Sequence, residues 1–162
     1  MPQILQKVEG FASHLVEVTG GEPLLQEEVY TLMEMLLKRG YDILLDTNGS
    51  LDIGRVPQGV VRILDIKPPK SGMSERMEWE NMERLRPTDE VKFVLVDRSD
   101  YQWAKGIVRK YSLLERVKVI FSPANGYLPL RNLAEWILED GLGVRLGCQF
   151  QKFIWGKETR GH

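Results

Sequence analysis

Short apolar runs alternate with longer amphipathic stretches along most of this chain. The runs have the length of buried strands, and the stretches between them repeat apolar residues at helical spacing. Strands are therefore predicted at residues 15–19, 41–46, 60–66, 91–96, 117–121 and 143–146. Helices are predicted at residues 3–11, 24–39, 74–86 and 130–139, with a further helix that Ser99 or Asp100 caps and that runs to Tyr111. Residues 149–155 are expected to form a short helix or an extended cover. This alternation favours an α/β fold with parallel strands.

Polar residues stand at the ends of several predicted strands. Thr19, Asn48, Lys67 and Ser122 each lie just past such an end. Parallel strands end at one edge of the sheet, which is where barrels and doubly wound sheets bind their ligands. These four side chains are therefore expected to face one crevice. Asn48 is the weakest candidate, because TNG at 47–49 is a common turn.

The run VEVTGGEPLLQ at residues 16–26 joins an apolar strand to a helical pattern through two glycines. Gly20 and Gly21 are able to take positive φ and to let a ligand approach the main chain. Glu22 adds a negative charge suited to an ammonium group, and Pro23 suits the first turn of a helix. A plain strand–turn–helix connection explains the spacing equally well.

A second motif, DIKPPKSG, occupies residues 65–72. Alternation along the strand places the side chains of Asp65 and Lys67 on the same face. Pro68 and Pro69 fix φ and stiffen the chain where it leaves the strand. A local ion pair between Asp65 and Lys67 is slightly favoured over a ligand-binding role on these residues alone.

The order of these motifs resembles that of a known enzyme family. TGGEP at residues 19–23 is similar to the methionine-binding loop of the radical S-adenosylmethionine enzymes. Four further segments narrow the resemblance to the 7-carboxy-7-deazaguanine synthases of queuosine and 7-deazapurine biosynthesis: DIKPPKSG at 65–72, DEVKFVLVDRSDYQWA at 89–104, SP at 122–123 and RLGCQFQKFIWG at 145–156. The resemblance covers nearly the whole chain and implies a partial (βα) barrel of the radical S-adenosylmethionine type, with parallel strands.

The resemblance also implies a cofactor, a substrate and the residues that hold them. The substrate would be a carboxy-tetrahydropterin, contacted by Thr19 and by the main chain of His162. An adenosyl radical would abstract hydrogen from it, and ring contraction with loss of ammonia would follow. The cofactor S-adenosylmethionine would be held by Gly20, Gly21, Glu22, Pro23, Asp65, Ile66, Lys67, Ser122, Ala124 and Asn125.

The chain departs from the family pattern at two places. The family holds a [4Fe-4S] cluster on a CxxxCxxC loop several tens of residues before TGGEP, and the magnesium ligand of relatives lies in that loop. This chain begins 18 residues before Thr19 and has one cysteine, Cys148, whereas such a cluster needs several thiolates. We therefore expect 1–162 to be a single truncated domain, inactive by itself, without the first barrel strand and the cluster loop. Gln151 also replaces a histidine of the family and loses its titrating group.

Composition narrows the classes of partner. The 162 residues suffice for one domain with its own core, and 22 basic against 23 acidic residues leave a net charge of −1. This balance argues against broad binding of nucleic acid, and no apolar run approaches the ~20 residues of a membrane span. One cysteine fits a reducing cytoplasm, and His14 has no neighbours that suggest a metal site. The strand at 15–19 is expected at an open sheet edge, which predicts a homodimer.

Two other functions stay open. Activating enzymes for glycyl-radical enzymes belong to the same superfamily and also carry TGGEP and a DIK segment. A cluster-free pseudoenzyme or binding module for a nucleoside-like ligand belongs to a different class, and the missing cysteines make it a serious rival for this polypeptide. An in-frame CxxxCxxC motif upstream of Met1 would exclude this last alternative.

Overall fold

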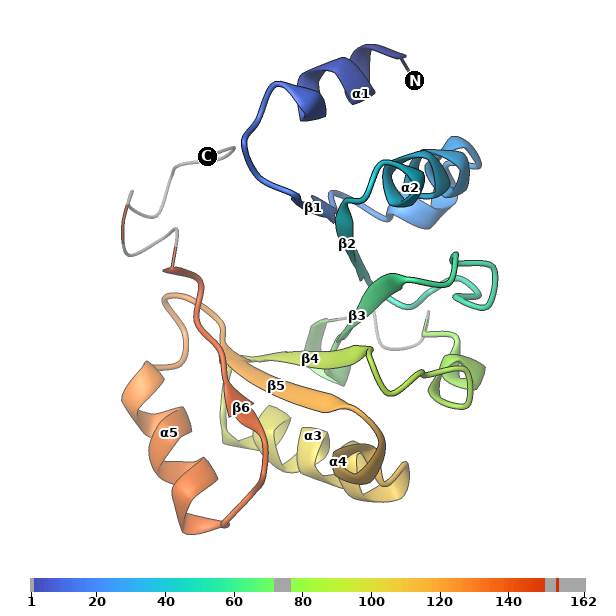
Figure 1. The fold of residues 1–162 in the computed structure, drawn as a ribbon. Coiled ribbons are helices and arrows are strands. Elements are labelled where there is room, and N and C mark those ends of the chain that lie inside the picture. Colours follow the sequence, from blue (N-terminus) through green and yellow to red (C-terminus); the bar gives the residue numbers. More distant parts are fainter. Residues whose placement is uncertain (1, 72–76, 151–153, 155–162) are drawn as a thin grey trace.

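The computed structural model describes residues 2–71, 77–150 and 154. Its centre is one sheet of six parallel strands in the order β1-β2-β3-β4-β5-β6, so each strand pairs with its neighbours in the sequence. The sheet curves but does not close within the described residues (Figure 1). This architecture confirms the predicted α/β fold with parallel strands. The strands are Leu15–Val18, Asp42–Thr47, Val60–Ile66, Glu90–Leu95, Lys118–Pro123 and Arg145–Leu146.

Helices connect β1 to β2, β4 to β5 and β5 to β6, and they lie on the outer side of the curved sheet (Figure 1). Helix α2 buries Val29, Met33 and Leu36, which recur at the spacing of one helical face. No helix among the described residues combines the length and the apolar composition that a membrane span requires. The α-helices are α1 Pro2–Glu9, α2 Glu28–Lys38, α3 Arg98–Lys110, α4 Leu113–Arg116 and α5 Leu130–Glu139, and the short 3-10 helices are η1 Pro23–Leu25, η2 Pro69–Ser71 and η4 Trp79–Met82.

Alternation along the four central strands, β2 to β5, separates a buried face from an open face. In β3, Leu64 and Ile66 are fully buried under the helices, whereas Ile63 and Asp65 are only half-buried. The side of the sheet opposite the helices is called the open face below. Aromatic rings fill the buried side, where Phe93 of β4 packs edge-on against Phe121 of β5 with ring centroids 5.4 Å apart.

A buried ion pair fastens the amino ends of β3 and β4. Arg62 and Asp89 have side chains that are 1% and 0% exposed. The guanidinium donates to Asp89 Oδ2, with Nε at 2.9 Å, and also to the carbonyls of Ile53 at 3.0 Å and Arg84 at 2.6 Å. These carbonyls belong to the loops before β3 and β4, so the Arg62 side chain holds both loops by hydrogen bonds.

The predicted helix at residues 74–86 is wrong where the structure describes that segment. Residues 72–76 lie outside the described residues, and among residues 77–86 the only helical turn is η4. The buried Asn81 side chain donates to the carbonyls of Gly49 and Leu51 at 3.1 and 2.8 Å. It also accepts from the Ile53 amide at 3.1 Å. These hydrogen bonds tie the segment to the loop after β2, where it forms a single 3-10 turn in place of the predicted helix.

Two helix starts also differ from the prediction. Helix α2 begins at Glu28 rather than at residue 24, because Pro23 opens a separate 3-10 turn. Asp97, rather than Ser99 or Asp100, caps α3, and its Oδ1 accepts from both of their amides at 2.9 and 3.0 Å. The short helix α4 is missing from the sequence prediction. Most of the predicted tail element at 149–155 lies outside the described residues.

Candidate functional site at the carboxyl edge of the sheet

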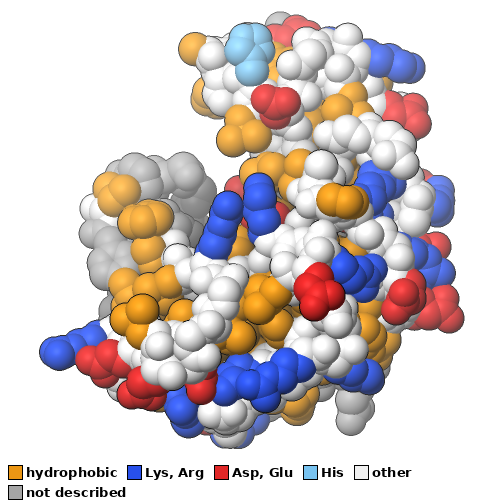
Figure 2. Space-filling view, turned by 60° about the horizontal axis from the view of Figure 1, so that its bottom comes forward, with side chains coloured by type: hydrophobic (Ala, Val, Ile, Leu, Met, Phe, Trp, Pro, Cys, Tyr) orange, Lys and Arg blue, Asp and Glu red, His pale blue; other side chains and the backbone are white. Residues whose placement is uncertain are grey.

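The carboxyl ends of the strands carry the polar residues that the sequence singled out. Thr19, Asn48 and Lys67 directly follow the last residues of β1, β2 and β3. Ser122 does not follow its strand but is the second-last residue of β5. The four residues therefore lie at one edge of the sheet, but none of them lines the cavity described below, so a single crevice that all four face stays a prediction. On the side shown in Figure 2, basic side chains stand beside a hollow in the molecular surface.

The two glycines after β1 have the conformation predicted for them. Gly20 and Gly21 have φ values of +105° and +58°, a region that side-chain-bearing residues rarely adopt. A Cβ atom added at either position would meet nothing within 4 Å. Both residues are exposed, so their main chain borders open space at the carboxyl edge.

Glu22 is tied into this loop and into the next one. Its side chain is buried, and Oε1 accepts from the Leu24 amide at 3.1 Å and from Thr47 Oγ1 at 2.8 Å. Oε2 accepts from the Asn48 amide at 2.8 Å. The carboxylate therefore joins the loop after β1 to the end of β2. Sequence reasoning assigned Glu22 to an ammonium group and missed this second task, because the partners lie 25 and 26 residues away.

Asn48 forms the turn that its sequence suggested. Its Oδ1 accepts from the Ser50 amide at 2.8 Å, and the Gly49 amide donates to Thr47 Oγ1 at 3.2 Å. The main chain of Asn48 is held by Glu22, so the loops after β1 and β2 form one connected unit.

Asp65 and Lys67 form the local ion pair that the residues favoured, with Lys67 Nζ 2.5 Å from Asp65 Oδ2. Lys92 of β4 reaches the same region from the neighbouring strand, 2.7 Å from Asp46 Oδ2 and 3.9 Å from Asp65 Oδ2. The side chain of Ile66 points into the core and is fully buried. Only the main chain of Ile66 is left for contact with a ligand on the open face.

Lys92 is a site residue that sequence reasoning missed. Burial works against its charged form, but the hydrogen bond to Asp46 and the charges of Asp65, Asp46 and Glu17 outweigh burial. The pKa of Lys92 therefore lies above its ordinary value, and the side chain stays charged. Periodicity along the sequence does not reveal this contact, because the parallel register of β3 and β4 is what places Lys92 directly beside Asp65.

A further ion pair ties two loops of the same edge. Lys70 Nζ, in the loop after β3, lies 2.5 Å from Asp97 Oδ2, in the loop after β4. The hydrogen bond from Lys70, together with those from Asp100 and Ser99, holds the pKa of Asp97 well below its ordinary value. The Ala124 amide continues the connection by donating to the Leu95 carbonyl at 2.7 Å.

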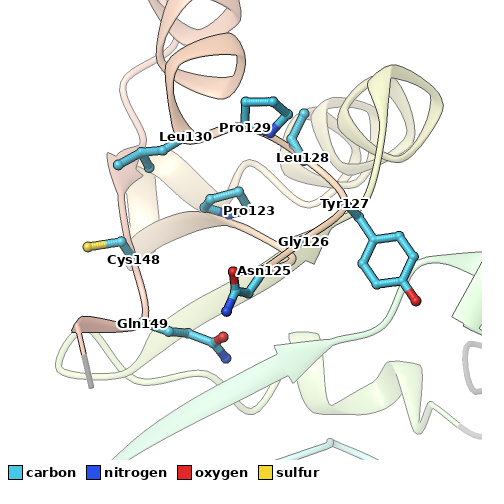
Figure 3. Close-up of a pocket in the computed structure, with 9 residues that line it drawn as sticks. All are labelled: Pro123, Asn125, Gly126, Tyr127, Leu128, Pro129, Leu130, Cys148 and Gln149. Atoms are coloured by element: carbon cyan, nitrogen blue, oxygen red, sulfur yellow. The ribbon is translucent and has the colours of Figure 1, made fainter. Parts of the chain in front are cut away.

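A cavity of about 410 Å³ lies at the carboxyl end of β5 (Figure 3). The side chains of Asn125 and Gln149 extend toward its opening, and Tyr127 points away from it. Gly147 allows the chain after β6 to run close to β5, because a Cβ there would collide with the Ser122 hydroxyl. The lining residues are Pro123, Asn125, Gly126, Tyr127, Leu128, Pro129, Leu130, Cys148 and Gln149.

The structure brings the predicted residues to one edge without gathering them in one cavity. Asn125 lines the cavity beside β5, whereas the loop at 20–22 and Asp65 do not. Ser122 is 7% exposed and Ala124 is half-buried. His162 and Gln151 lie outside the described residues.

Candidate metal ligands are scarce in the part of the chain that the structure describes. No group of three His, Cys, Asp or Glu residues there is arranged to hold a metal ion. Cys148 is half-buried and lines the cavity beside β5. One thiolate does not fit an iron–sulfur cluster, which several cysteines normally hold.

Curated relatives share most of this chain. It is 46% identical over 161 residues to the 7-carboxy-7-deazaguanine synthase of Koribacter versatilis, a match that covers 91% of this chain and 71% of the relative. The enzyme of the same name from Chlorobaculum tepidum is 39% identical, with 98% of this chain and 74% of the relative covered. The one from Leptospira interrogans is 34% identical, with 96% and 71% covered. No protein-family model matches the chain.

A solved structure supports the fold. The crystal structure of QueE from Escherichia coli superimposes with a TM-score of 0.69 at 18% identity. The match covers 91% of this chain and 61% of that one. At this identity the likeness concerns the fold, and it agrees with an open sheet that forms part of a barrel.

Proposed function

Because the chain belongs to the 7-carboxy-7-deazaguanine synthase family of radical S-adenosylmethionine lyases, we propose that the carboxyl edge of its sheet binds S-adenosylmethionine. The family acts on a small pterin-like molecule, and we propose that this chain contributes binding groups for that substrate as well. The single observation that carries the proposal is the loop Gly20–Glu22: its two glycines are open and have positive φ, and its Glu22 side chain accepts from the amide of Asn48, just after β2.

The methionine part of the ligand fits the glycine loop. Gly20 and Gly21 leave room where any other residue would place a side chain, so the ligand can contact the main chain directly. Glu22 lends its negative charge from a fixed position, although its oxygens already accept three hydrogen bonds. Its main role in binding is therefore to hold the loop and to favour an ammonium group nearby.

The nucleoside part fits the cavity beside β5. Its walls contain Pro123, Leu128 and Pro129, which suit a flat heterocycle, and Asn125 and Gln149 offer amide groups for the polar atoms. Asp65 and Lys67 lie on the open face between this cavity and the glycine loop, because β3 stands between β1 and β5 in the sheet. Thr19, exposed at the end of β1, is available to the pterin-like substrate.

The residues of this chain do not fit the iron–sulfur cluster of the family. The sequence has Cys148 as its one cysteine, and that residue lies after β6 rather than beside the glycine loop. This polypeptide is therefore proposed to bind and orient the ligands, without a redox step of its own.

Chemical-shift mapping tests the proposal. We expect S-adenosylmethionine to shift the amide signals of Gly20, Gly21 and Asn125. The amides of Gly40 and Gly141, glycines of positive φ that precede β2 and β6, serve as internal controls and should not move. Methionine alone should shift the glycine pair, and adenosine alone should shift Asn125. Shifts confined to the controls, or none at millimolar ligand, would contradict the proposal.

We also propose that the chain self-associates through β1 in the cytoplasm. Strand β1 is at the edge of the described sheet, and Leu15 and the nearby Phe11 are 54% and 73% exposed. An open edge with apolar side chains favours pairing with another chain, and a single thiol fits a reducing compartment. Sedimentation equilibrium over a concentration range should show dimers, and a monomer at every concentration would contradict this assembly.

A further inference from the structure

A chain of alternating charges crosses three strands on the open face. Asp46 of β2, Asp65 of β3 and Lys92 of β4 lie on this face, and Asp65 and Lys92 are direct partners in the parallel register. Lys92 Nζ is 2.7 Å from Asp46 Oδ2 and 3.9 Å from Asp65 Oδ2, and Lys67 approaches the same Asp65 oxygen at 2.5 Å. Lys67 therefore donates a hydrogen bond to one oxygen of Asp65, and Lys92, which is bonded to Asp46, lies within ion-pair distance of the same oxygen.

The other oxygen of Asp65 has no such partner. Within the described residues, Oδ1 is buried and accepts no hydrogen bond, although the carboxylate as a whole is 14% exposed. A buried carboxylate oxygen without a donor is unfavourable, and nearly all such atoms in folded proteins are satisfied. An acceptor left unsatisfied in this way, in a side chain near the carboxyl end of β3, suits a donor from a ligand.

We propose that Lys92 is a positioning residue that, with Lys67, holds one oxygen of Asp65 and leaves the other to accept a hydrogen bond from an N–H or O–H group of the bound ligand. The inference rests on the proposed binding of S-adenosylmethionine, which offers ribose hydroxyls and amino groups as donors. Lys92 itself need not touch the ligand.

The cross-strand position explains why Lys92 matters in addition to Lys67. Lys67 follows the end of the strand that carries Asp65 and is 34% exposed, so we expect its contact alone to restrain the carboxylate less than a contact that is also anchored on another strand. Lys92 is 23% exposed and is anchored by Asp46 on the far side. Its raised pKa keeps it charged, so the link between β2, β3 and β4 persists across the neutral pH range.

A pair of matched variants tests the role by calorimetry with S-adenosylmethionine. Lys92→Met keeps the length of the side chain and removes its charge, and we expect binding about tenfold weaker, as for the loss of one hydrogen bond to a charged group. Lys118→Met is the control, since Lys118 is a lysine of the next strand that pairs with Glu90 at 3.6 Å and is remote from Asp65. Equal affinity of the Lys92 variant and the wild type would overturn the proposal.

A double-mutant cycle shows whether Lys92 acts through Asp65. Asp65→Asn should also weaken binding about tenfold, because the cations hold the amide oxygen and turn its NH₂ group toward the ligand. The double variant of Lys92 and Asp65 should then bind no more weakly than Asp65→Asn alone. Fully additive losses would show that Lys92 acts on the ligand directly and would overturn the positioning role.

A measurement without ligand separates this inference from the proposed function. Three-bond couplings to Asp65 Cγ should report a single χ1 rotamer in the wild type and averaging in Lys92→Met. Identical couplings in both would overturn the positioning role whether or not a ligand binds. Absence of binding by the wild type would instead defeat the proposed function, while the couplings would still decide the role of Lys92.

Discussion

Replacing Glu22 by glutamine tests whether this acid holds two loops of the candidate site together. The carboxylate accepts from Leu24 and Thr47 at one oxygen and from Asn48 at the other. Glutamine keeps one oxygen and replaces the other by an NH₂ group. In the better of its two orientations, the amide oxygen keeps the first two donors and the NH₂ group faces the Asn48 N–H.

The structure sets the size of the effect. One hydrogen bond to a charged acceptor is lost, which costs about 1.5–3 kcal/mol, and the two that remain become neutral and weaker. We therefore expect Glu22→Gln to lower the free energy of unfolding by about 2–3 kcal/mol. For a chain of this length the change corresponds to a fall in Tm of roughly 4–12 °C.

Urea denaturation followed by circular dichroism measures this difference, and Glu27→Gln provides the control. Glu27 and its partner Arg55 lie 2.6 Å apart with side chains 71% and 59% exposed. Exposed pairs contribute only about 0–1 kcal/mol, so the control should change stability little. A loss below about 1 kcal/mol in Glu22→Gln, equal to that of the control, would refute the proposed link between the loops.

Three further predictions concern stability, pH and the cluster. Asp89→Asn should cost about 3–5 kcal/mol in urea denaturation, because it leaves the buried charge of Arg62 without its counter-ion; a change below about 1 kcal/mol would contradict that account. The pKa of Asp97 is lower in the folded chain than in the unfolded chain, where it is about 3.9. The Asp97 carboxylate therefore stabilises the fold at pH values above its unfolded pKa, and this stabilisation is lost as the pH falls through its folded pKa. Tm against pH should therefore fall less steeply below about pH 4 in Asp97→Asn than in the wild type, and equal slopes would count against the Lys70 contact. Anaerobic reconstitution of this chain should give no stoichiometric cubane cluster and no 5′-deoxyadenosine, because Cys148 is its one thiol; spectroscopy that shows a full cluster with turnover would contradict this expectation.

The four central strands, β2 to β5, were predictable because each buries side chains on one face. The predicted range 60–66 matches β3 at both ends, since four of its side chains alternate into the core. Other strand ends shift by one or two residues, where main-chain pairing rather than hydrophobicity sets the last residue. Gly20 and Gly21 were also predictable, because positive φ favours glycine wherever it occurs.

The segment around η4 was not predictable, because its apolar residues recur at a spacing that resembles that of a helix. Met77, Met82 and Leu85 recur at intervals of three to five residues. The Asn81 side chain, however, donates hydrogen bonds to carbonyls of the loop after β2. Such contacts join residues about 30 positions apart, and periodicity does not reveal them. The link from Glu22 to β2 and the contact of Lys92 with Asp65 depend in the same way on strand register.

The most direct test of the proposed site compares two glycine variants in their affinity for S-adenosylmethionine. Gly21 and Gly141 have φ values of +58° and +56°, and a Cβ at either meets nothing within 4 Å. Valine should therefore strain the backbone equally at both positions, by at least about 1–2 kcal/mol. Gly141→Val, between α5 and β6, should bind like the wild type in calorimetry, whereas Gly21→Val should lose all measurable binding because its side chain occupies the place of the ligand. Unchanged affinity in folded Gly21→Val would contradict the account.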